Sequence, residues 1–316
     1  MNSTYHEVEQ MQNRTEVLRL LSLVCCIIVL PSMLLGQIPD QVGWADTVAA
    51  QYRVFPDITY LVANKYEAKL DVCVPRNVPG PLPTLMYIHG GGWVGGTKEG
   101  AVLSVLPYLQ LGWVVVNVEY RLGRISLAPA AVEDCLCALR WMYRNAREYK
   151  IDTTKIVVTG HSAGGHLALT TGMIPASAGL DRQCAGGPEE PKVAAIINWY
   201  GITDVGDLLD GPNKKTYAVN WMASLTNREE IAKRVSPMTY VRKGLPPTLS
   251  IHGDVDPTVP YTHAVRLHEA LEKFGVPNQL VTIPGGKHGG FDPAQSMRAY
   301  SAIREFLSKH SILKKK

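Results

Sequence analysis

Residues 155–165 read KIVVTGHSAGG, and they place Ser162 between a short apolar run and a helix-like segment that extends to Met173. A strand, a tight turn that carries a serine and a helix give the pattern G-x-S-x-G its meaning, because the turn exposes the hydroxyl. Glycine at positions 160 and 164 avoids a collision of side chains with the neighbouring backbone. The stretch therefore predicts a strained turn that presents a serine nucleophile.

Apolar runs alternate with helix-like stretches on both sides of this turn. Strand-like segments lie at residues 57–62, 68–74, 84–88, 113–118, 155–159, 193–199, 248–252 and 279–283. The helix-like stretches that separate them include residues 99–110, 129–149 and 166–173. Strands that alternate with helices in this way predict an α/β fold, a doubly wound and mostly parallel sheet with helices on both faces.

Length and composition suit one large catalytic domain, which we expect over residues 37–316. The chain has 316 residues, of which 46% are apolar and 19% charged, and its net charge is +4. Three of those charges are the terminal lysines 314–316, so neither a nucleic-acid nor a membrane-surface patch is indicated. Residues 204–236 are rich in polar side chains and interrupt the alternation, which predicts a small lid-like insertion over the sheet.

The N-terminal residues 1–36 differ from the rest of the chain. Residues 20–30, LLSLVCCIIVL, form an apolar run that Pro31 ends and that follows Arg14 and Arg19. This run is shorter than the roughly 20 residues of a membrane-spanning helix and suits the core of an export signal. We expect a protein exported to the periplasm or secreted after cleavage. The alternatives are an uncleaved membrane anchor, the only case with membrane association, and a buried helix.

The six cysteines have no metal-ligand spacing and are too few for a disulfide scaffold. Cys73 lies in an expected strand, Cys135 and Cys137 in an expected helix, and Cys184 in an expected loop. One disulfide stays open as an alternative, but buried free thiols are the default expectation. No metal and no cofactor are expected.

A serine hydroxyl needs an adjacent base, which a carboxylate in turn orients. In this architecture the chain order is serine, acid, histidine, and each partner follows the end of a strand. His288 alone among the late histidines lies in a glycine-rich loop between the last strand and the last helix. His263, His268 and His310 fall on expected helices, so His288 is the candidate base.

Two aspartates compete for the orienting role in the segment HGDVDPTVP, residues 252–260. Asp254 is placed to form the turn, because short polar side chains bond to their own backbone there. Asp256 lies further out and is held by Pro257, so it is the preferred candidate. Asp204 and Asp292 are weaker alternatives.

A glycine-rich loop, HGGGW at residues 89–93, follows the strand that ends at Ile88. Glycines there let backbone N–H groups point inward, as donors to a developing oxyanion must. We expect Gly91, Gly92 and the N–H of Ala163 to form this oxyanion hole. A phosphate loop at residues 95–98 is disfavoured, because the spacing of a Walker motif is missing.

Three aromatic residues lie at or just beyond strand ends near the expected site: Trp93, Trp199 and Tyr200. They are candidates for the walls of a substrate pocket, although core packing is the more common role of such side chains. His161 and His166 flank the nucleophile and are expected to pack or cap.

Taken in order, these motifs resemble the α/β-hydrolase superfamily, and within it the esterase/lipase group that carries an HGGG loop. The resemblance covers roughly residues 68–306 and rests on HGGGW, EYR (119–121), GHSAGG (160–165), HGDVDPTVP and GKHGGF (286–291). It is closest to the branch of feruloyl and acetylxylan esterases, with kynurenine formamidases and isoprenylcysteine methylesterases nearby. The resemblance implies the same triad, Ser162, Asp256 and His288, and the same oxyanion donors.

These observations lead us to expect a serine carboxylesterase that hydrolyses short-chain, aryl or carbohydrate acyl esters through an acyl-enzyme. The alternatives are an amidase such as an arylformamidase and a peptidase of the prolyl-oligopeptidase kind, which use the same triad. Such peptidases normally lack the HGGG loop and carry a large extra domain. A hydrolase fold that only binds is a further alternative, but it usually lacks a triad member. The expected partner is a small-molecule ester, and the sequence gives no oligomeric state.

Overall fold

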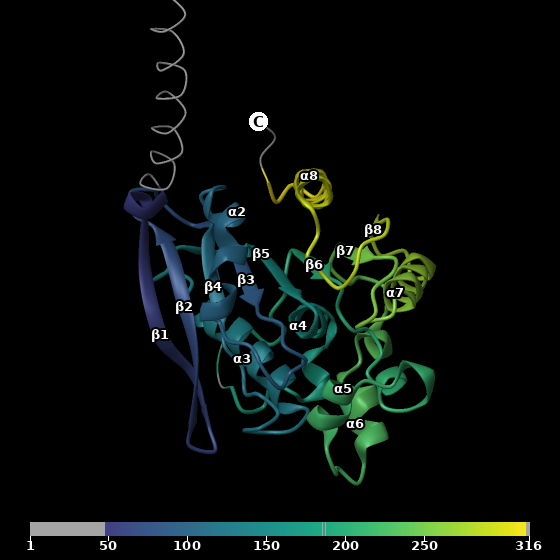
Figure 1. Ribbon diagram of the computed structural model, residues 1–316. Coiled ribbons are helices and arrows are strands. Elements are labelled where there is room, and N and C mark those ends of the chain that lie inside the picture. The colour runs from purple at the N-terminus through teal and green to yellow at the C-terminus, as the bar shows by residue number, and fades with distance from the viewer. Residues whose placement is uncertain (1–47, 185, 187, 314–316) are drawn as a thin grey trace, which may run out of the picture. The chain divides into compact units, whose positions relative to one another are not determined.

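The structure of the protein is a computed structural model that describes residues 48–184, 186 and 188–313 (Figure 1). Residues 48–51 are helical, and residues 53–313 belong to one compact unit. The expected export signal or anchor, residues 1–36, lies outside the described residues. Within the described residues, none of the helices has both the length and the hydropathy that crossing a bilayer requires.

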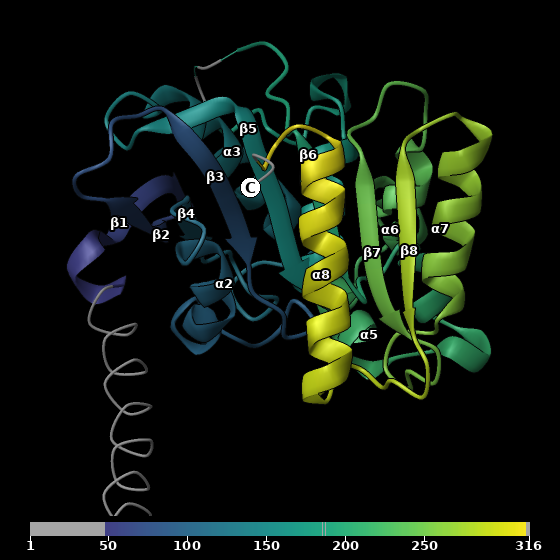
Figure 2. The ribbon, with the colours of Figure 1, turned by 90° about the horizontal axis from the view of Figure 1, so that it is seen from above.

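An eight-stranded sheet has the order β1-β2-β4-β3-β5-β6-β7-β8. The strands are β1 (Tyr52–Ala63), β2 (Tyr66–Pro75), β3 (Leu82–Ile88), β4 (Val114–Val118), β5 (Ile151–His161), β6 (Ala195–Trp199), β7 (Thr248–Gly253) and β8 (Asn278–Ile283). β2 pairs antiparallel with β4, and every later pair in this order is parallel. The carboxyl ends of β3, β5 and β7 therefore lie at one edge of the sheet (Figure 2).

Helices cover both faces of the sheet, as the doubly wound fold requires. Along β3, Met86 and Ile88 enter one apolar cluster while Leu85 and Tyr87 enter the other, because successive side chains of a strand point to opposite faces. The first cluster includes residues of α3 (Ala130–Arg144), α4 (Ala163–Met173) and α7 (Thr262–Lys273). The second includes α8 (Pro293–Lys309), which lies on the same side as α2 (Leu106–Leu109) in Figure 1.

Two helical predictions need correction. The stretch expected to be one helix over residues 99–110 is a 3-10 segment, η1 (Glu99–Val105), followed by the single turn of α2. Pro107 in the first turn of α2 lacks the N–H that a continuous helix would use there. The helix expected to reach residue 149 ends at Arg144.

The insertion at residues 204–236 lies between β6 and β7 and contains two short helices, α5 (Thr216–Met222) and α6 (Arg228–Val235). Four of the remaining helical segments are single 3-10 turns: η2 (Ala176–Ala178), η3 (Gly206–Leu208), η4 (Gly211–Asn213) and η5 (Pro237–Tyr240). Side chains of α5 are buried, among them Trp221, which has no exposed surface. The insertion is therefore packed into the core of the unit.

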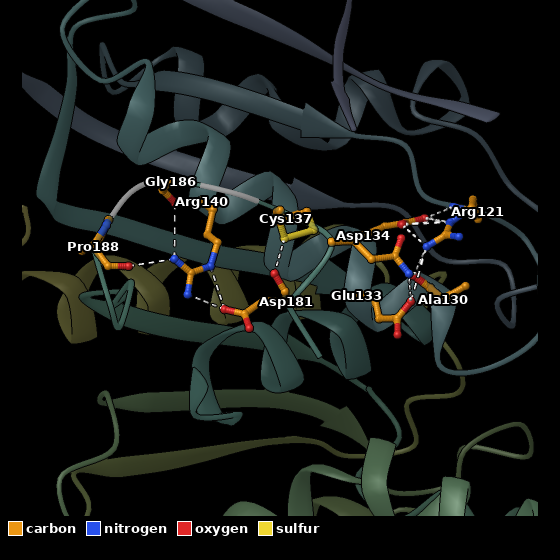
Figure 3. Close-up of a disulfide and its surroundings, with 11 residues drawn as sticks. Arg121, Ala130, Glu133, Asp134, Cys137, Arg140, Asp181, Gly186 and Pro188 are labelled. Carbon is orange, nitrogen blue, oxygen red and sulfur yellow. Dashed lines mark hydrogen bonds and ion pairs between the residues drawn. A yellow bond between two sulfur atoms is a disulfide. The ribbon is translucent and has the colours of Figure 1, made fainter. Parts of the chain in front are cut away.

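A disulfide joins Cys137 of α3 to Cys184, so the default expectation of free thiols is wrong for this pair. The i, i+2 spacing turns Cys137 away from Cys135, which stays a buried free thiol. Beside the disulfide, Arg140 Nε donates to Asp181 Oδ2 at 2.7 Å (Figure 3). The loop that follows α4 is thus tied to α3 both covalently and by an ion pair.

Candidate active site

Ser162 lies at the turn between β5 and α4, with φ of 57° and ψ of −120°. A Cβ on Gly160 would lie 2.4 Å from the carbonyl oxygen of Ile88, and one on Gly164 would lie 2.1 Å from that same oxygen. These distances are too short for any side chain. Glycine at both positions lets the serine turn pack directly against the end of β3.

His288 comes from the loop between β8 and α8, and it lies between the serine and an aspartate. Its Nε2 is 2.8 Å from Ser162 Oγ, and its Nδ1 is 2.7 Å from Asp256 Oδ2. Both separations are hydrogen-bond distances. The structure therefore brings together three residues that are 126 and 32 positions apart along the chain.

Asp256 is fixed by its own loop, which follows β7. Its Oδ1 accepts hydrogen bonds from the backbone N–H groups of Thr258 at 2.7 Å and Val259 at 3.0 Å. Burial acts to raise the pKa of this carboxyl, but hydrogen bonds from side chains and backbone outweigh burial and hold its pKa well below the usual range. The carboxylate is therefore ionised throughout the neutral pH range.

The other acidic candidates have different partners. Asp254 accepts a hydrogen bond from the N–H of Gly285 at 2.7 Å, which is the turn-forming role expected of it. Asp292 caps the first turn of α8, and Asp204 lies 3.5 Å from Arg266. Among the four aspartates, Asp256 is the one that contacts His288.

The loop at residues 89–93 has the backbone form that only glycine adopts readily. Gly91 has φ of 117° and Gly92 has φ of 60°, and a Cβ on Gly91 would lie 2.0 Å from the carbonyl oxygen of Gly95. In the described chain, the N–H groups of Gly91, Gly92 and Ala163 donate to no protein atom. Three unpaired donors therefore lie at or next to the serine.

A cavity of about 390 Å³ opens at this point. Its lining contains Ser162, His288, Gly91 and Gly92, and four further residues complete it, namely His161, Tyr200, Tyr217 and Thr258. The Tyr200 ring meets the His288 ring edge to face at 4.7 Å. The serine and the histidine thus face a small, partly aromatic chamber.

Of the three aromatic residues expected to shape a pocket, Tyr200 alone lines this cavity. Trp93 has no exposed surface, because it stacks on Trp221 at 4.2 Å and donates its Nε1–H to His166 at 3.1 Å. Trp199 is 5% exposed and packs in the core against His161. The expectation of pocket roles for Trp93 and Trp199 is therefore corrected to core packing.

Sequence reasoning missed Tyr217 and Thr258, and it expected His161 to pack or cap. Tyr217 is held over the cavity because its hydroxyl donates to the carbonyl of Thr258 at 3.1 Å. Burial, together with the nearby His288, lowers the pKa of His161 to about 4, so this ring is neutral at pH 7. The position of His161 directly before the nucleophile was the signal for its place in the lining.

A larger cavity of about 860 Å³ lies at the amino ends of the strands, around Pro81 and Trp113. Its lining contains no serine paired with a histidine, whereas the lining of the smaller cavity contains Ser162 and His288. In the part of the chain that the structure describes, no three His, Cys, Asp or Glu side chains converge as a metal-binding group.

Comparison with known proteins gives a consistent result. The model of the BD-FAE family matches residues 70–271, a range that contains Ser162 and Asp256 and ends before His288. The curated esterase LipQ of Mycobacterium tuberculosis is 27% identical over 244 residues, which cover 74% of this chain and 57% of LipQ. The chain spans 55–61% of the length of three such curated relatives.

Two solved structures are similar over most of the chain. One is a truncated carbohydrate esterase from gut microbiota, with a TM-score of 0.71, 25% identity and coverage of 83% of this chain and 97% of that one. The other is a thermophilic esterase from the planctomycete Thermogutta terrifontis, with a TM-score of 0.70, 28% identity and coverage of 84% and 95%. The fold is thus shared with solved esterases over nearly their whole length.

Proposed function

Because the chain belongs to the BD-FAE family and has the α/β-hydrolase fold, we propose that it is a serine carboxylesterase acting on small ester substrates. The observation that carries the proposal is the continuous contact from Ser162 Oγ through His288 to Asp256, at 2.8 and 2.7 Å. Acyl transfer needs this arrangement, in which a base contacts the attacking hydroxyl and a buried carboxylate contacts the base.

In the proposed reaction Ser162 Oγ attacks the ester carbonyl while His288 Nε2 takes the hydroxyl proton. The ionised Asp256 holds the imidazole through Nδ1 and stabilises its protonated form. The N–H groups of Gly91, Gly92 and Ala163 receive the negative charge of the tetrahedral intermediate. His288 then passes its proton to the departing alcohol, and an acyl-enzyme remains.

Water completes the cycle by the same path. His288 takes a proton from a water molecule that attacks the acyl carbonyl, and it returns this proton to Ser162 Oγ when the acid leaves. Both halves of the reaction use one base and one set of oxyanion donors, so the chain's own residues supply every proton transfer.

The size of the cavity supports short acyl groups as the substrate class. About 390 Å³ is at the small end of ligand sites, and the rings of Tyr200 and Tyr217 line it. The thermophilic Thermogutta esterase 2 has been solved with propionate and with butyrate bound. We infer esters of acids with about two to four carbons, with the alcohol group directed out of the open side of the cavity.

The test uses p-nitrophenyl acetate, butyrate and octanoate and an acyl p-nitroanilide. We expect turnover of the short esters, weak turnover of octanoate and little of the anilide. The Ser162→Ala variant should lose at least about 10⁴-fold in kcat. Ser301→Ala, a change of an exposed serine on α8, serves as the control. Near-wild-type hydrolysis by Ser162→Ala would sink the proposal, and preference for the anilide would favour an amidase.

The proposed localisation is export, as the apolar run at residues 20–30 suggests. The Cys137–Cys184 disulfide supports it, because disulfides persist mainly in oxidising compartments. Mass spectrometry of the protein from its host, with free thiols blocked before digestion, should find the two peptides linked in the exported fraction. Recovery of only reduced protein in the cytosolic fraction would contradict export.

A further inference from the structure

Asp256 contacts a second histidine, and the triad does not explain that contact. His252 lies on β7, four positions before Asp256, and its side chain has no exposed surface. Its Nε2 is 3.3 Å from Asp256 Oδ2, the oxygen that also meets His288 Nδ1 at 2.7 Å. Two imidazoles therefore share one carboxylate oxygen.

The surroundings of His252 determine which ring nitrogen carries the proton. Nε2 also lies 3.0 Å from the carbonyl oxygen of Val259, so it faces two oxygens that have no proton to offer. Nε2 must therefore be the donor, and in this tautomer Nδ1 is a bare acceptor. In the described chain, Nδ1 is buried and has no hydrogen-bond partner.

An unpaired buried acceptor destabilises the folded state. An apolar side chain of similar size would avoid that penalty but would leave the carbonyl of Val259 without its donor, so His252 also has a structural role in this loop. Asp256 Oδ2 is the second oxygen near this nitrogen, 3.3 Å from Nε2, and an apolar side chain would remove that contact as well. This points to a role of His252 in the chemistry of the carboxylate.

Two charged side chains lie on or against the same loop, but neither contacts His252 or Asp256 in the described chain. Asp254 accepts from the N–H of Gly285, and Lys215 Nζ donates to the carbonyl of Pro257 at 2.8 Å. The rings of Tyr200 and Tyr261 cover His252 at 6.5 and 5.7 Å, and β8 presents the uncharged Thr282 beside it. Burial raises the pKa of Tyr200 and of Tyr217 above the ordinary range. Burial, with a contribution from His288, lowers the pKa of His161 to about 4. His161, Tyr200 and Tyr217 are therefore uncharged between about pH 5 and 9.

We propose that His252 is a positioning residue that tunes His288 through Asp256, by donating Nε2–H toward the oxygen on which His288 depends. Each donor to a carboxylate oxygen withdraws negative charge from it, so the oxygen stabilises a protonated imidazole less. Without His252 the full charge of Oδ2 would face His288. The base would then keep its proton to a higher pH. This inference rests on the proposed esterase function.

The experiment compares three variants at position 252 by the dependence of kcat/KM on pH, with p-nitrophenyl acetate as substrate. The acid limb of that profile reports protonation of the base in the free enzyme. Active enzyme is counted by stoichiometric reaction with paraoxon, so a loss of folded protein does not distort the rates. In His252→Leu, which has no donor, the acid limb should move to higher pH by about half a unit or more.

His252→Gln and His252→Asn separate the donor from the shape of the ring. The Gln amide nitrogen reaches the position of Nε2 and restores a donor there, so this variant should keep the wild-type profile. The Asn amide is too short to reach Asp256 and should reproduce the shift of the Leu variant. If His252→Leu does not fold, the acid limbs of His252→Gln and His252→Asn are compared instead. A limb at higher pH in His252→Asn than in His252→Gln would support the inference, and equal limbs would overturn it.

His268→Leu is the matched control. His268 is a 7% exposed histidine on α7 that also has one buried nitrogen without a partner, while its Nδ1 contacts Asn278 at 2.8 Å. It should lose stability without moving the acid limb. An unmoved limb in His252→Leu and His252→Asn, or a limb moved to lower pH, would overturn the inference. Activity retained by Ser162→Ala would instead overturn the proposed function itself.

Discussion

At the scale of single residues, two side chains of the same type have different roles in the site. Asp254 and Asp256 stand two positions apart on one loop, yet the first holds the N–H of Gly285 and the second holds His288. The two N–H groups that fix Asp256 Oδ1 come from the next residues along the chain. In the loop after β7, the carboxylate of Asp256 thus contacts His288, while that of Asp254 stabilises the turn.

This distinction makes a paired prediction. Asp256→Asn should lower kcat/KM by about 10³–10⁴-fold, because an amide nitrogen facing His288 Nδ1 favours the wrong tautomer of the base. Asp254→Asn should lower it less than about tenfold, because its effect is limited to the turn. Steady-state rates with p-nitrophenyl acetate at pH 8, per titrated active site, measure both. Equal losses in the two variants would show that the loop, and not the carboxylate of Asp256, limits activity.

At the scale of elements, the insertion at residues 204–236 is anchored to the loops of the site. Tyr217 of α5 donates to the carbonyl of Thr258, and Lys215 just before α5 donates to the carbonyl of Pro257 at 2.8 Å. Trp221 stacks on Trp93 behind the glycine loop. A cover that opens freely would lack such ties, so we propose that α5 is a fixed wall of the cavity and not a mobile lid.

A fixed wall should determine acyl-chain length. Tyr217→Ala removes the ring from the cavity lining, and the ratio of kcat/KM for octanoate to that for butyrate should rise roughly fivefold or more, since each buried methylene contributes about 0.8 kcal/mol. Tyr217→Phe keeps the ring and loses only the hydrogen bond to Thr258, so its ratio should stay at the wild-type value. A ratio unchanged in Tyr217→Ala would mean that α5 does not limit the acyl group.

At the scale of the whole molecule, the sequence predicted the sheet and the meeting of Ser162, Asp256 and His288 because these depend on local signals. Apolar periodicity identifies strands, and glycine and proline identify the loops at strand ends. Tyr217 and the disulfide could not be predicted in the same way. They depend on packing between segments 41 and 47 residues apart, for which no local pattern exists. The prediction of one helix over residues 99–110 was wrong for a local reason, because Pro107 interrupts the helical hydrogen bonding there.

The disulfide is also the feature whose loss should act on the whole unit. Closing a loop over a separation of 47 residues restricts the unfolded chain and corresponds to about 4 kcal/mol in the chain-entropy model. Cys137→Ser should therefore lower the free energy of unfolding by about 2–4 kcal/mol in urea titrations. The reductant dithiothreitol should destabilise the wild type by a similar amount and leave Cys137→Ser unchanged.

Cys73→Ser is the control, because Cys73 is a half-buried free thiol that forms no disulfide. It should retain the sensitivity of the wild type to reductant. None of the residues that line the cavity at Ser162 belongs to α3 or to the loop at Cys184, so kcat/KM at 25 °C should be unaffected in folded Cys137→Ser. If dithiothreitol left the free energy of unfolding of the wild type unchanged, the disulfide would add nothing to stability. The disulfide would then support export only through the oxidising environment that its persistence requires.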